Sequence, residues 1–415
     1  MTQGNQKRLR YVIYSFNYLI AAIGLILFSD FMPVLLENVR GFNNEQQSLF
    51  ILVVMFPLIL KPFIALFIDK FKKLKQNRRL FLVVSDIIIF TSMFLMGIDL
   101  VNGNFLAFLF VTLGANIGIS LTDVRSDEII VEEELQDTTN VSFIVMLTTI
   151  VGWIAIYTFY LGFVGNDINT GWFPLFFASA LFALPLIFLS AKLHNPVLER
   201  QPTRKSRDSH VMNSNQRNDR MKNSTKTAPK LILYIIFLLV LQAPAFGDYV
   251  FEPYIVSTYG GDAFASYNSV SLISNLFSLV ILVIFWFKRY YFLSKRKLAF
   301  VVLLAITVIT WVAPVTGSLA FINIMAFFEG PLFIAGTFYL FSTYMDAAPA
   351  KRGSALFQAF NTIYIGSGFI YRIIGIRIAS ISSDGMVFIF IAVISVIGML
   401  LIQPLKFRDT LSLMK

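Results

Sequence analysis

Cysteine is absent from this 415-residue chain, and only two histidines are present, His194 and His210. Without cysteine the chain has no disulfides and no thiolate metal sites. Both histidines lie in a polar segment, so histidine proton relays inside a membrane are excluded as well. Charged residues are also scarce, at 14% of the chain against about 25% in an average soluble protein. We therefore expect no bound metal and no cofactor, and the low charge points toward a membrane protein.

Apolar residues make up 57% of the sequence and are gathered into long runs. Most of these runs approach the ~20 residues that a helix needs to cross a bilayer. They lack the alternating pattern of a membrane barrel, and helices satisfy their own backbone groups inside lipid. The sequence predicts an all-α polytopic membrane protein with twelve transmembrane helices, roughly at 11–36, 47–70, 79–99, 104–125, 141–164, 172–192, 231–257, 263–287, 298–314, 318–345, 353–380 and 384–405.

The formal net charge of +10 would suit a nucleic-acid partner, but the distribution of the charge gives another explanation. If the N-terminus is intracellular, nearly all Lys and Arg residues fall in segments that face the cytoplasm. The loops on the opposite side contain one basic residue, Arg40. This is the positive-inside rule. We predict a multi-pass protein of the plasma membrane with both termini cytoplasmic, and no nucleic-acid partner.

A polar segment, 194–230, separates the spans into two sets of six. It has too few apolar residues to bury a core, so we predict a flexible cytoplasmic linker. The linker would join an N-terminal six-helix bundle, 1–193, to a C-terminal six-helix bundle, 231–415. Paired six-helix halves around a central cavity are how many secondary transporters alternate access, and the arrangement resembles the major facilitator superfamily.

No Gly-x-x-x-x-Gly-Lys-Ser/Thr loop is present, so ATP-driven transport by this chain alone is not expected. We expect no enzymatic activity. The energy for transport would come from an ion gradient, or the protein would be a facilitator. The expected partners are a small-molecule substrate, protons and the lipid bilayer.

Lys61 lies inside the second span, about nine residues or ~13 Å before its cytoplasmic end. That depth strains the reach of a lysine that extends to the interface. We expect Lys61 to face the cavity and to pair with an acid or an anionic substrate. Asp86 lies at a similar depth in the third span, where it could form a structural ion pair with Lys61 or take part in proton coupling.

Acidic and basic residues gather at the cytoplasmic ends of the second and fourth spans. Asp69 precedes a basic loop that ends in Arg78 and Arg79. A carboxylate at a helix end can bind arginines and neighbouring helix N-termini, and so hold one access state closed. Asp123 and Asp127 are four residues apart and share a helical face. We predict that these five residues form a gate; alternatively, Asp123 carries a coupling proton.

The seventh span is interrupted by Pro244, Gly247 and Pro253, around Asp248 and Glu252. Broken helices at membrane depth usually line a cavity, where the freed backbone groups find partners. Two acids on one face there suit a proton or cation acceptor. The alternative is a wetted extracellular vestibule.

Glu329 lies near the middle of the tenth span, beside a second predicted helix break at Gly330 and Pro331. It is a candidate for proton coupling, or else it forms a structural ion pair with Arg372 or Arg377 of the eleventh span. The guanidinium of Arg372 could instead clamp a substrate carboxylate. Neutral substrate contacts could come from amide and phenol side chains, many of which in other proteins only join helices: Asn17, Asn116, Gln242, Asn268, Asn275, Gln358, Asn361 and Tyr364.

Two motifs resemble the folate–biopterin transporter family of the major facilitator superfamily. In that family's second span, Lys-Pro is followed by six residues, an Asp and an Arg-rich loop; Lys61-Pro62, Asp69 and Arg78-Arg79 have this spacing. The end of the fourth span, 123–132, is similar to the family pattern that begins Asp-Val-x-x-Asp. The sequence departs from the family in lacking the usual glycine before the loop. Related families that move muropeptides or acetyl-coenzyme A share the Asp-x-x-x-Asp element.

The resemblance implies membrane uptake of folates or pterins, commonly coupled to protons. Lys61 and Arg372 would then attract the anion, and Glu329, or Asp248 with Glu252, would take the proton. The alternatives are a major facilitator transporter of another solute, such as a sugar, peptide, drug or muropeptide, or a membrane protein that keeps the fold for sensing or assembly without transport.

Overall fold

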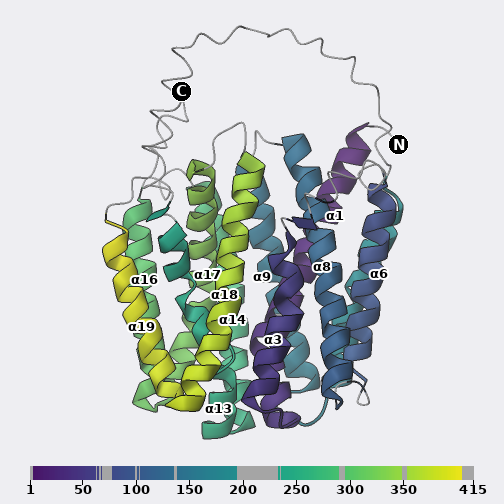
Figure 1. Ribbon diagram of the computed structural model, residues 1–415. Coiled ribbons are helices and arrows are strands. Elements are labelled where there is room, and N and C mark those ends of the chain that lie inside the picture. Colours follow the sequence, from purple (N-terminus) through teal and green to yellow (C-terminus); the bar gives the residue numbers. More distant parts are fainter. Residues whose placement is uncertain are drawn as a thin grey trace.

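A computed structural model describes much of the chain, and its side chains are placed except at 3–7, 78, 126–142, 296, 329, 333, 337–347, 353–362 and 365. The described residues are 3–61, 63, 64, 67, 77–98, 101, 103–134, 138–193, 232, 233, 235–288, 295–347 and 353–403. Within them the secondary structure is helical and no strand occurs (Figure 1). The predicted linker, 194–230, and Asp69 lie outside the described residues.

The helices follow the predicted spans in order. In the N-terminal half they are α1 (Gln3–Ile26), η1 (Leu27–Phe31), α2 (Met32–Val34), η2 (Leu35–Val39), α3 (Asn44–Ile59), α6 (Arg78–Met96), α8 (Phe105–Glu134), α9 (Thr138–Phe163), α10 (Trp172–Leu181) and α11 (Ala183–Ala191). In the C-terminal half they are η3 (Ala243–Phe246), α13 (Phe251–Tyr259), α14 (Gly261–Phe287), α16 (Arg296–Val312), η4 (Ala313–Thr316), α17 (Leu319–Ala347), α18 (Gly353–Ile381) and α19 (Asp384–Leu401).

Nine helical segments in the described part of the chain are long and apolar enough to cross a membrane. The remaining predicted spans are occupied by α3, by α18, and by the helical residues 235–241 together with α13. The all-α membrane fold that the sequence predicts is confirmed.

The two halves lie side by side, with the long helices of both running in roughly the same direction (Figure 1). Helix α1 begins and α19 ends at the same end of the bundle, the upper end in the figure, and α13 lies at the opposite end. The halves meet where α9 packs on α14 and α3 packs on α18, with α13 against α2 and η2. The contacts between the two halves are therefore made by residues of these four helices, of α13 and of the first span.

The first span is not a regular α-helix. Two π-helical turns, η1 and η2, flank α2, and every residue of η1 is buried. Single π-helical turns inside longer helices are frequent at functional sites. The turn η1 contains Asp30, an acid within a wholly buried segment.

The two predicted helix breaks have different outcomes. The seventh span is broken as expected, because residues 247–250 form a turn between η3 and α13. The predicted break at Gly330 and Pro331 is wrong, since α17 runs through both residues. Proline has no N–H for the Phe327 carbonyl. The hydroxyl of Ser274, on the neighbouring α14, donates to that carbonyl at 2.6 Å and accepts from the Gly330 N–H at 3.2 Å.

Candidate functional site

An ion pair between Arg372 and Asp248 stands where the C-terminal half faces the N-terminal half. Arg372 donates from Nε and Nη2 to the same oxygen, Oδ2 of Asp248, at 2.9 and 2.6 Å. The guanidinium carbon lies 5.3 Å from the centre of the Phe369 ring, one turn earlier on α18. The Arg372 side chain is 9% exposed and that of Asp248 is 25% exposed. The sequence singled out both residues but did not predict this pairing.

The local backbone explains why these two side chains meet. Asp248 is carried by the turn that follows η3, so its side chain leaves the helix axis of the broken span. Gly375 lies almost one turn after Arg372, and a Cβ on it would clash with the carbonyl of Phe246. Because glycine lacks this atom, α18 packs directly on η3 and brings Arg372 up to Asp248.

Asp30 faces this ion pair from the N-terminal half, and sequence reasoning overlooked it. Its side chain is bound by two hydroxyls: Ser29 Oγ lies 2.5 Å from Oδ1, and Tyr157 of α9 donates to Oδ2 at 2.6 Å. Asp30 also interacts electrostatically with Asp248 and Arg372 across the boundary between the halves. The signal was available, since Asp30 is the one acid in the predicted first span, 11–36.

Tyr249 connects these groups. Its ring is buried, and its hydroxyl has no hydrogen-bond partner among the described residues. It interacts electrostatically with Arg372, Asp248, Glu252 and Asp30. Glu252 itself is 6% exposed, on the first turn of α13. We call these five residues the central cluster: Asp30, Asp248, Tyr249, Glu252 and Arg372.

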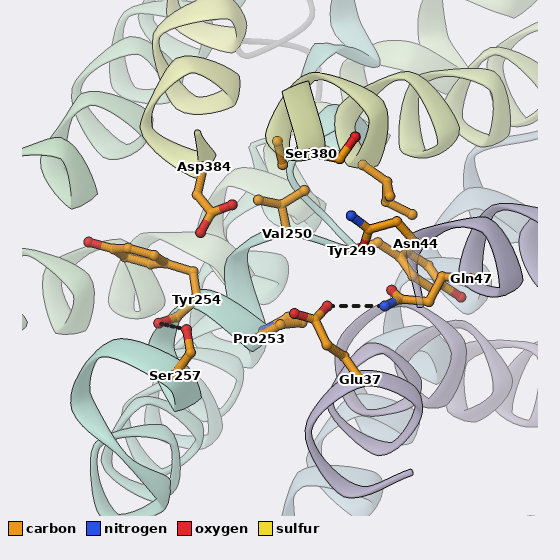
Figure 2. A pocket seen from close by; sticks show the side chains of 12 residues that line it. Glu37, Asn44, Gln47, Tyr249, Val250, Pro253, Tyr254, Ser257, Ser380 and Asp384 are labelled. Atoms are coloured by element: carbon orange, nitrogen blue, oxygen red, sulfur yellow. Dashed lines mark hydrogen bonds between the residues drawn. The ribbon is translucent and has the colours of Figure 1, made fainter. Parts of the chain in front are cut away.

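A cavity of about 110 Å³ lies beside α13 and shares Tyr249 with the central cluster (Figure 2). It lies between the halves, and Tyr249 belongs to its wall. Gln47 of α3 donates to Glu37 of η2 at 3.2 Å within it. Sites for small organic ligands measure roughly 300–1,000 Å³, so in this conformation the cavity is too small for such a ligand. Its lining comes from both halves: Glu37, Asn44, Gln47, Tyr249, Val250, Pro253, Tyr254, Ser257, Ile376, Ala379, Ser380 and Asp384.

A second charged network lies within the N-terminal half. Lys61 Nζ is 2.5 Å from Asp123 Oδ2, and the amide of Asn17 donates to Asp123 Oδ1 at 3.0 Å. The suggested pair of Lys61 with Asp86 is therefore wrong. The network joins α1 and α8 to the residues that follow α3. It pairs Lys61, which the sequence predicts to bind substrate, with Asp123, which the sequence predicts to belong to the gate.

Asp86 is instead held by hydroxyls. It is fully buried on α6, where Thr122 donates to Oδ1 at 3.3 Å and Ser190 donates to Oδ2 at 2.8 Å. These donors come from α8 and α11, so Asp86 lies among helices of one half. Its surroundings tie it to the N-terminal bundle and not to the boundary between the halves.

The other predicted site residues are placed as follows. Asn116 is buried, and its amide donates to the Thr112 carbonyl of its own helix at 3.5 Å. Arg79 and Arg377 are exposed. Several side chains lie outside the described part of the chain, although their helices are described: Arg78, Asp127, Glu329, Gln358 and Asn361.

Arg125 was also passed over in the sequence. Its side chain is fully buried near the end of α8, and its guanidinium carbon lies 4.8 Å from the centre of the Phe81 ring. A buried guanidinium two residues after Asp123 adds a second cation to this end of the N-terminal half. The signal for it was a basic residue at the very end of the predicted fourth span, 104–125.

Comparisons with known proteins agree with this architecture. The nucleoside transporter NupG has a TM-score of 0.62 at 14% identity, covering 97% of this chain and 100% of that one. The D-xylose-proton symporter has a TM-score of 0.68 at 14% identity, covering 96% and 98%. The xylose transporter XylE from E. coli has a TM-score of 0.63 at 13% identity, covering 94% and 96%. No curated protein matches the chain by sequence.

These likenesses establish the fold, that of major facilitator transporters. A family model adds to them: the model of the BT1 family matches residues 27–325, which is more than half of the chain. The match includes Asp30, the pair of Lys61 and Asp123, and the broken seventh span with Asp248, whereas Asn17 and Arg372 lie outside it. The chain therefore belongs to the BT1 family, a family of major facilitator-type membrane transporters.

Proposed function

We propose that this transporter imports a ring-bearing organic anion, of the folate or pterin kind, together with protons, by alternating access across the plasma membrane. The observation that carries the proposal is the partly buried pair of Arg372 and Asp248, which interacts electrostatically with Asp30 of the other half. The expected orientation has both termini in the cytoplasm.

Arg372 supplies the anion specificity in this proposal. A guanidinium offers a planar fork that binds a carboxylate through two parallel bonds. In the present state Nε and Nη2 both donate to Asp248. A substrate carboxylate has the same acceptor geometry as Asp248, so it competes for the same donors. Binding of the anion is then an exchange of one carboxylate for another at a fixed cation.

Charge balance explains why a proton would accompany the anion. A substrate carboxylate at Arg372 adds a negative charge to a site that already holds Asp248 and Asp30. Uncompensated charge at this depth is costly. A proton on one of the acids removes the excess. The sequence proposes Asp248, Glu252, Glu329 and Asp86 as acceptors for it.

Aromatic rings near Arg372 favour a substrate with a flat ring. Phe369 contacts the guanidinium, and Tyr364 interacts electrostatically with Arg372 and Asp248. Aromatic faces of this kind stack with heteroaromatic rings. Gln358 and Asn361, on the same helix, and Asn116 remain proposed neutral contacts to the substrate.

The Lys61 network is proposed to belong to the cytoplasmic gate. Lys61 binds Asp123 of α8, and the Asn17 amide of α1 donates to the same carboxylate. Asp69, Arg78, Arg79 and Asp127 are proposed to complete the gate. In this role Lys61 stabilises the N-terminal bundle and does not bind the substrate directly.

A second candidate function is the transport of a neutral polar solute. Asn268 on α14 is fully buried, and neither polar atom of its amide has a hydrogen-bond partner among the described residues. Such an amide suits the hydroxyls of a sugar or nucleoside. Two of the similar structures named above are a nucleoside transporter and a D-xylose-proton symporter.

Uptake by the purified protein in lipid vesicles tests the proposal. Labelled folate, biopterin, a nucleoside and D-xylose are offered separately, with and without a pH gradient that is acidic outside the vesicles. We expect folate or biopterin to enter, and to enter faster when the acidic side is outside. Uptake of only the nucleoside or the sugar would favour the second candidate. A correctly folded protein that takes up none of the four contradicts the proposed substrate class.

A further inference from the structure

We propose that Asp30 is the residue that binds the transported proton, and that the hydroxyl of Ser29 reorients as the proton comes and goes. The proposal rests on the proposed function in one respect, namely that transport is coupled to protons. It names a residue of the N-terminal half that the sequence did not single out.

The position of Asp30 suits a carboxyl that changes its charge. Asp30 is 6% exposed, inside a π-helical turn whose five residues are all buried. A permanently ionised carboxylate at such a depth is normally held by a cation. The described cation that interacts electrostatically with Asp30 is Arg372, and it gives its hydrogen bonds to Asp248. The described hydrogen-bond partners of Asp30 are two hydroxyls, which suit either protonation state.

Counting hydrogens around Ser29 identifies two states of this carboxyl. Ser29 Oγ lies 2.9 Å from the Leu25 carbonyl oxygen and 2.5 Å from Asp30 Oδ1. A serine hydroxyl has a single hydrogen, and a carbonyl oxygen can only accept. When Ser29 donates to Leu25, the hydrogen in the short contact must come from a protonated Asp30, which donates to Ser29 Oγ. When Asp30 is ionised, Ser29 rotates to donate to it instead.

Tyr157 completes the site without opposing either state. Its hydroxyl donates to Asp30 Oδ2 at 2.6 Å, and that oxygen accepts whether Oδ1 is protonated or not. Tyr157 is on α9, so the proton site is shared by two helices of the N-terminal half. Loading and release of the proton then require only rotation of one hydroxyl.

The groups that face Asp30 connect its charge to the other half. Asp248, Tyr249 and Arg372 of the C-terminal half interact with it electrostatically. An ionised Asp30 attracts Arg372 and repels Asp248, whereas a neutral Asp30 leaves Arg372 to Asp248. The strength of attraction between the halves therefore differs between the two protonation states. A proton can shift an equilibrium between access states only through such a difference.

Two assays on the same vesicles test this role. One measures accumulation of labelled substrate driven by a pH gradient, and the other measures exchange of labelled for unlabelled substrate without a gradient. A symporter that moves one proton accumulates its substrate about tenfold for a gradient of about one pH unit. We expect Asp30→Asn to lose this accumulation while exchange, measured in the same vesicles, is still detectable. Asp86→Asn tests the competing assignment, because Asp86 is another buried acid whose described partners are hydroxyls.

The outcomes separate this inference from the proposed function. Wild-type and Asp30→Asn proteins that accumulate substrate equally would overturn the role of Asp30 and leave proton coupling intact. Loss of accumulation in Asp86→Asn but not in Asp30→Asn would also overturn it. A wild-type protein that exchanges folate or biopterin but ignores the gradient would overturn proton coupling and this inference together.

A milder pair of variants keeps the test valid if Asp30→Asn does not fold. Tyr157→Phe removes a donor to the ionised carboxylate, so the pH of half-maximal gradient-driven uptake should rise by about one unit. Tyr160→Phe is the matched control: it is buried on the same helix, and its hydroxyl has no hydrogen-bond partner among the described residues. We expect no shift from Tyr160→Phe. Equal pH profiles for the two variants would contradict the role of Asp30.

Discussion

In two regions of this protein a basic residue binds an aspartate, and a third residue interacts with that pair. The chemistry of the third residue differs between the two regions. Lys61 binds Asp123, and the third member is the neutral amide of Asn17, in the same half. Arg372 binds Asp248, and the third member is another acid, Asp30, from the opposite half. The first group is therefore neutral by itself, whereas the second carries one excess negative charge unless a proton is bound.

This difference separates a structural role from a transport role. The neutral group lies within one half, where it holds together helices of the proposed cytoplasmic gate. The group with excess charge lies across the boundary between the halves, so its interactions change when the halves move. Substitutions in the Lys61 network should therefore affect mainly stability, and substitutions in the central cluster should affect mainly transport.

The largest effect is expected from Arg372→Lys. Lysine keeps the charge but loses the planar fork, so a substrate carboxylate loses one charge-assisted bond of roughly 1.5–3 kcal/mol. The concentration for half-maximal uptake should rise about 10- to 100-fold. Vesicle uptake at several substrate concentrations measures this change.

Arg377→Lys is the matched control, because Arg377 lies on the same helix and is exposed. It should transport like the wild type. If both variants lose affinity to the same extent, the site of anion binding is not at Arg372.

The next effect concerns Lys61→Met, which leaves Asp123 with only the Asn17 amide as a described partner. Breaking a buried ion pair costs about 3–5 kcal/mol, and the partial exposure of this one should reduce the loss to about 2 kcal/mol. Thermal unfolding in detergent should show the loss, and the double variant with Asp123→Leu should recover part of it. Unchanged stability combined with loss of anion affinity would assign Lys61 to the substrate, as the sequence suggested.

A smaller change sharpens the comparison from the backbone side. Gly375→Ala places a Cβ against the Phe246 carbonyl, so α18 must move away from η3 and carry Arg372 away from Asp248. Overpacking of this kind costs about 1–3 kcal/mol. Uptake should fall along with thermal stability. In the same helix, Gly366→Ala would bring a Cβ to only 3.8 Å from Ile59, an ordinary contact, so it should be neutral; a loss there as large as in Gly375→Ala would refute the explanation.

Much of the fold could be predicted because lipid constrains the sequence directly. Apolar runs and the positions of Lys and Arg were enough to place the spans, and Pro244 with Gly247 was enough to place the break before α13. The break at Pro331 was predicted wrongly for a physical reason. The missing hydrogen-bond donor is supplied by Ser274 from another helix, which no local pattern reveals.

The site was predictable in its residue types but not in its pairs. Lys61, Asp248 and Arg372 were recognisable as charges inside spans. Which charges meet depends on how each helix is rotated and packed, and close packing at positions such as Gly375 fixes that rotation. Asp30 was missed because neither its π-helical turn nor its contact with Tyr157, a residue distant in the sequence, is visible in the local pattern of the first span.

The smallest expected effect lies away from both charged groups, in the contact of Ser274 with α17. Ser274→Ala removes one hydrogen bond to the Phe327 carbonyl, worth about 1 kcal/mol, at the point where Pro331 leaves that carbonyl without its helical partner. Ser269→Ala is the control, since the Ser269 hydroxyl donates to the Ala265 carbonyl of its own helix. The unfolding temperature should be lowered by Ser274→Ala but not by Ser269→Ala, and both variants should keep wild-type uptake. If Ser274→Ala instead abolishes gradient-driven accumulation at unchanged stability, then the helix turn that carries Glu329 takes part in coupling, and the transport role is not confined to the central cluster.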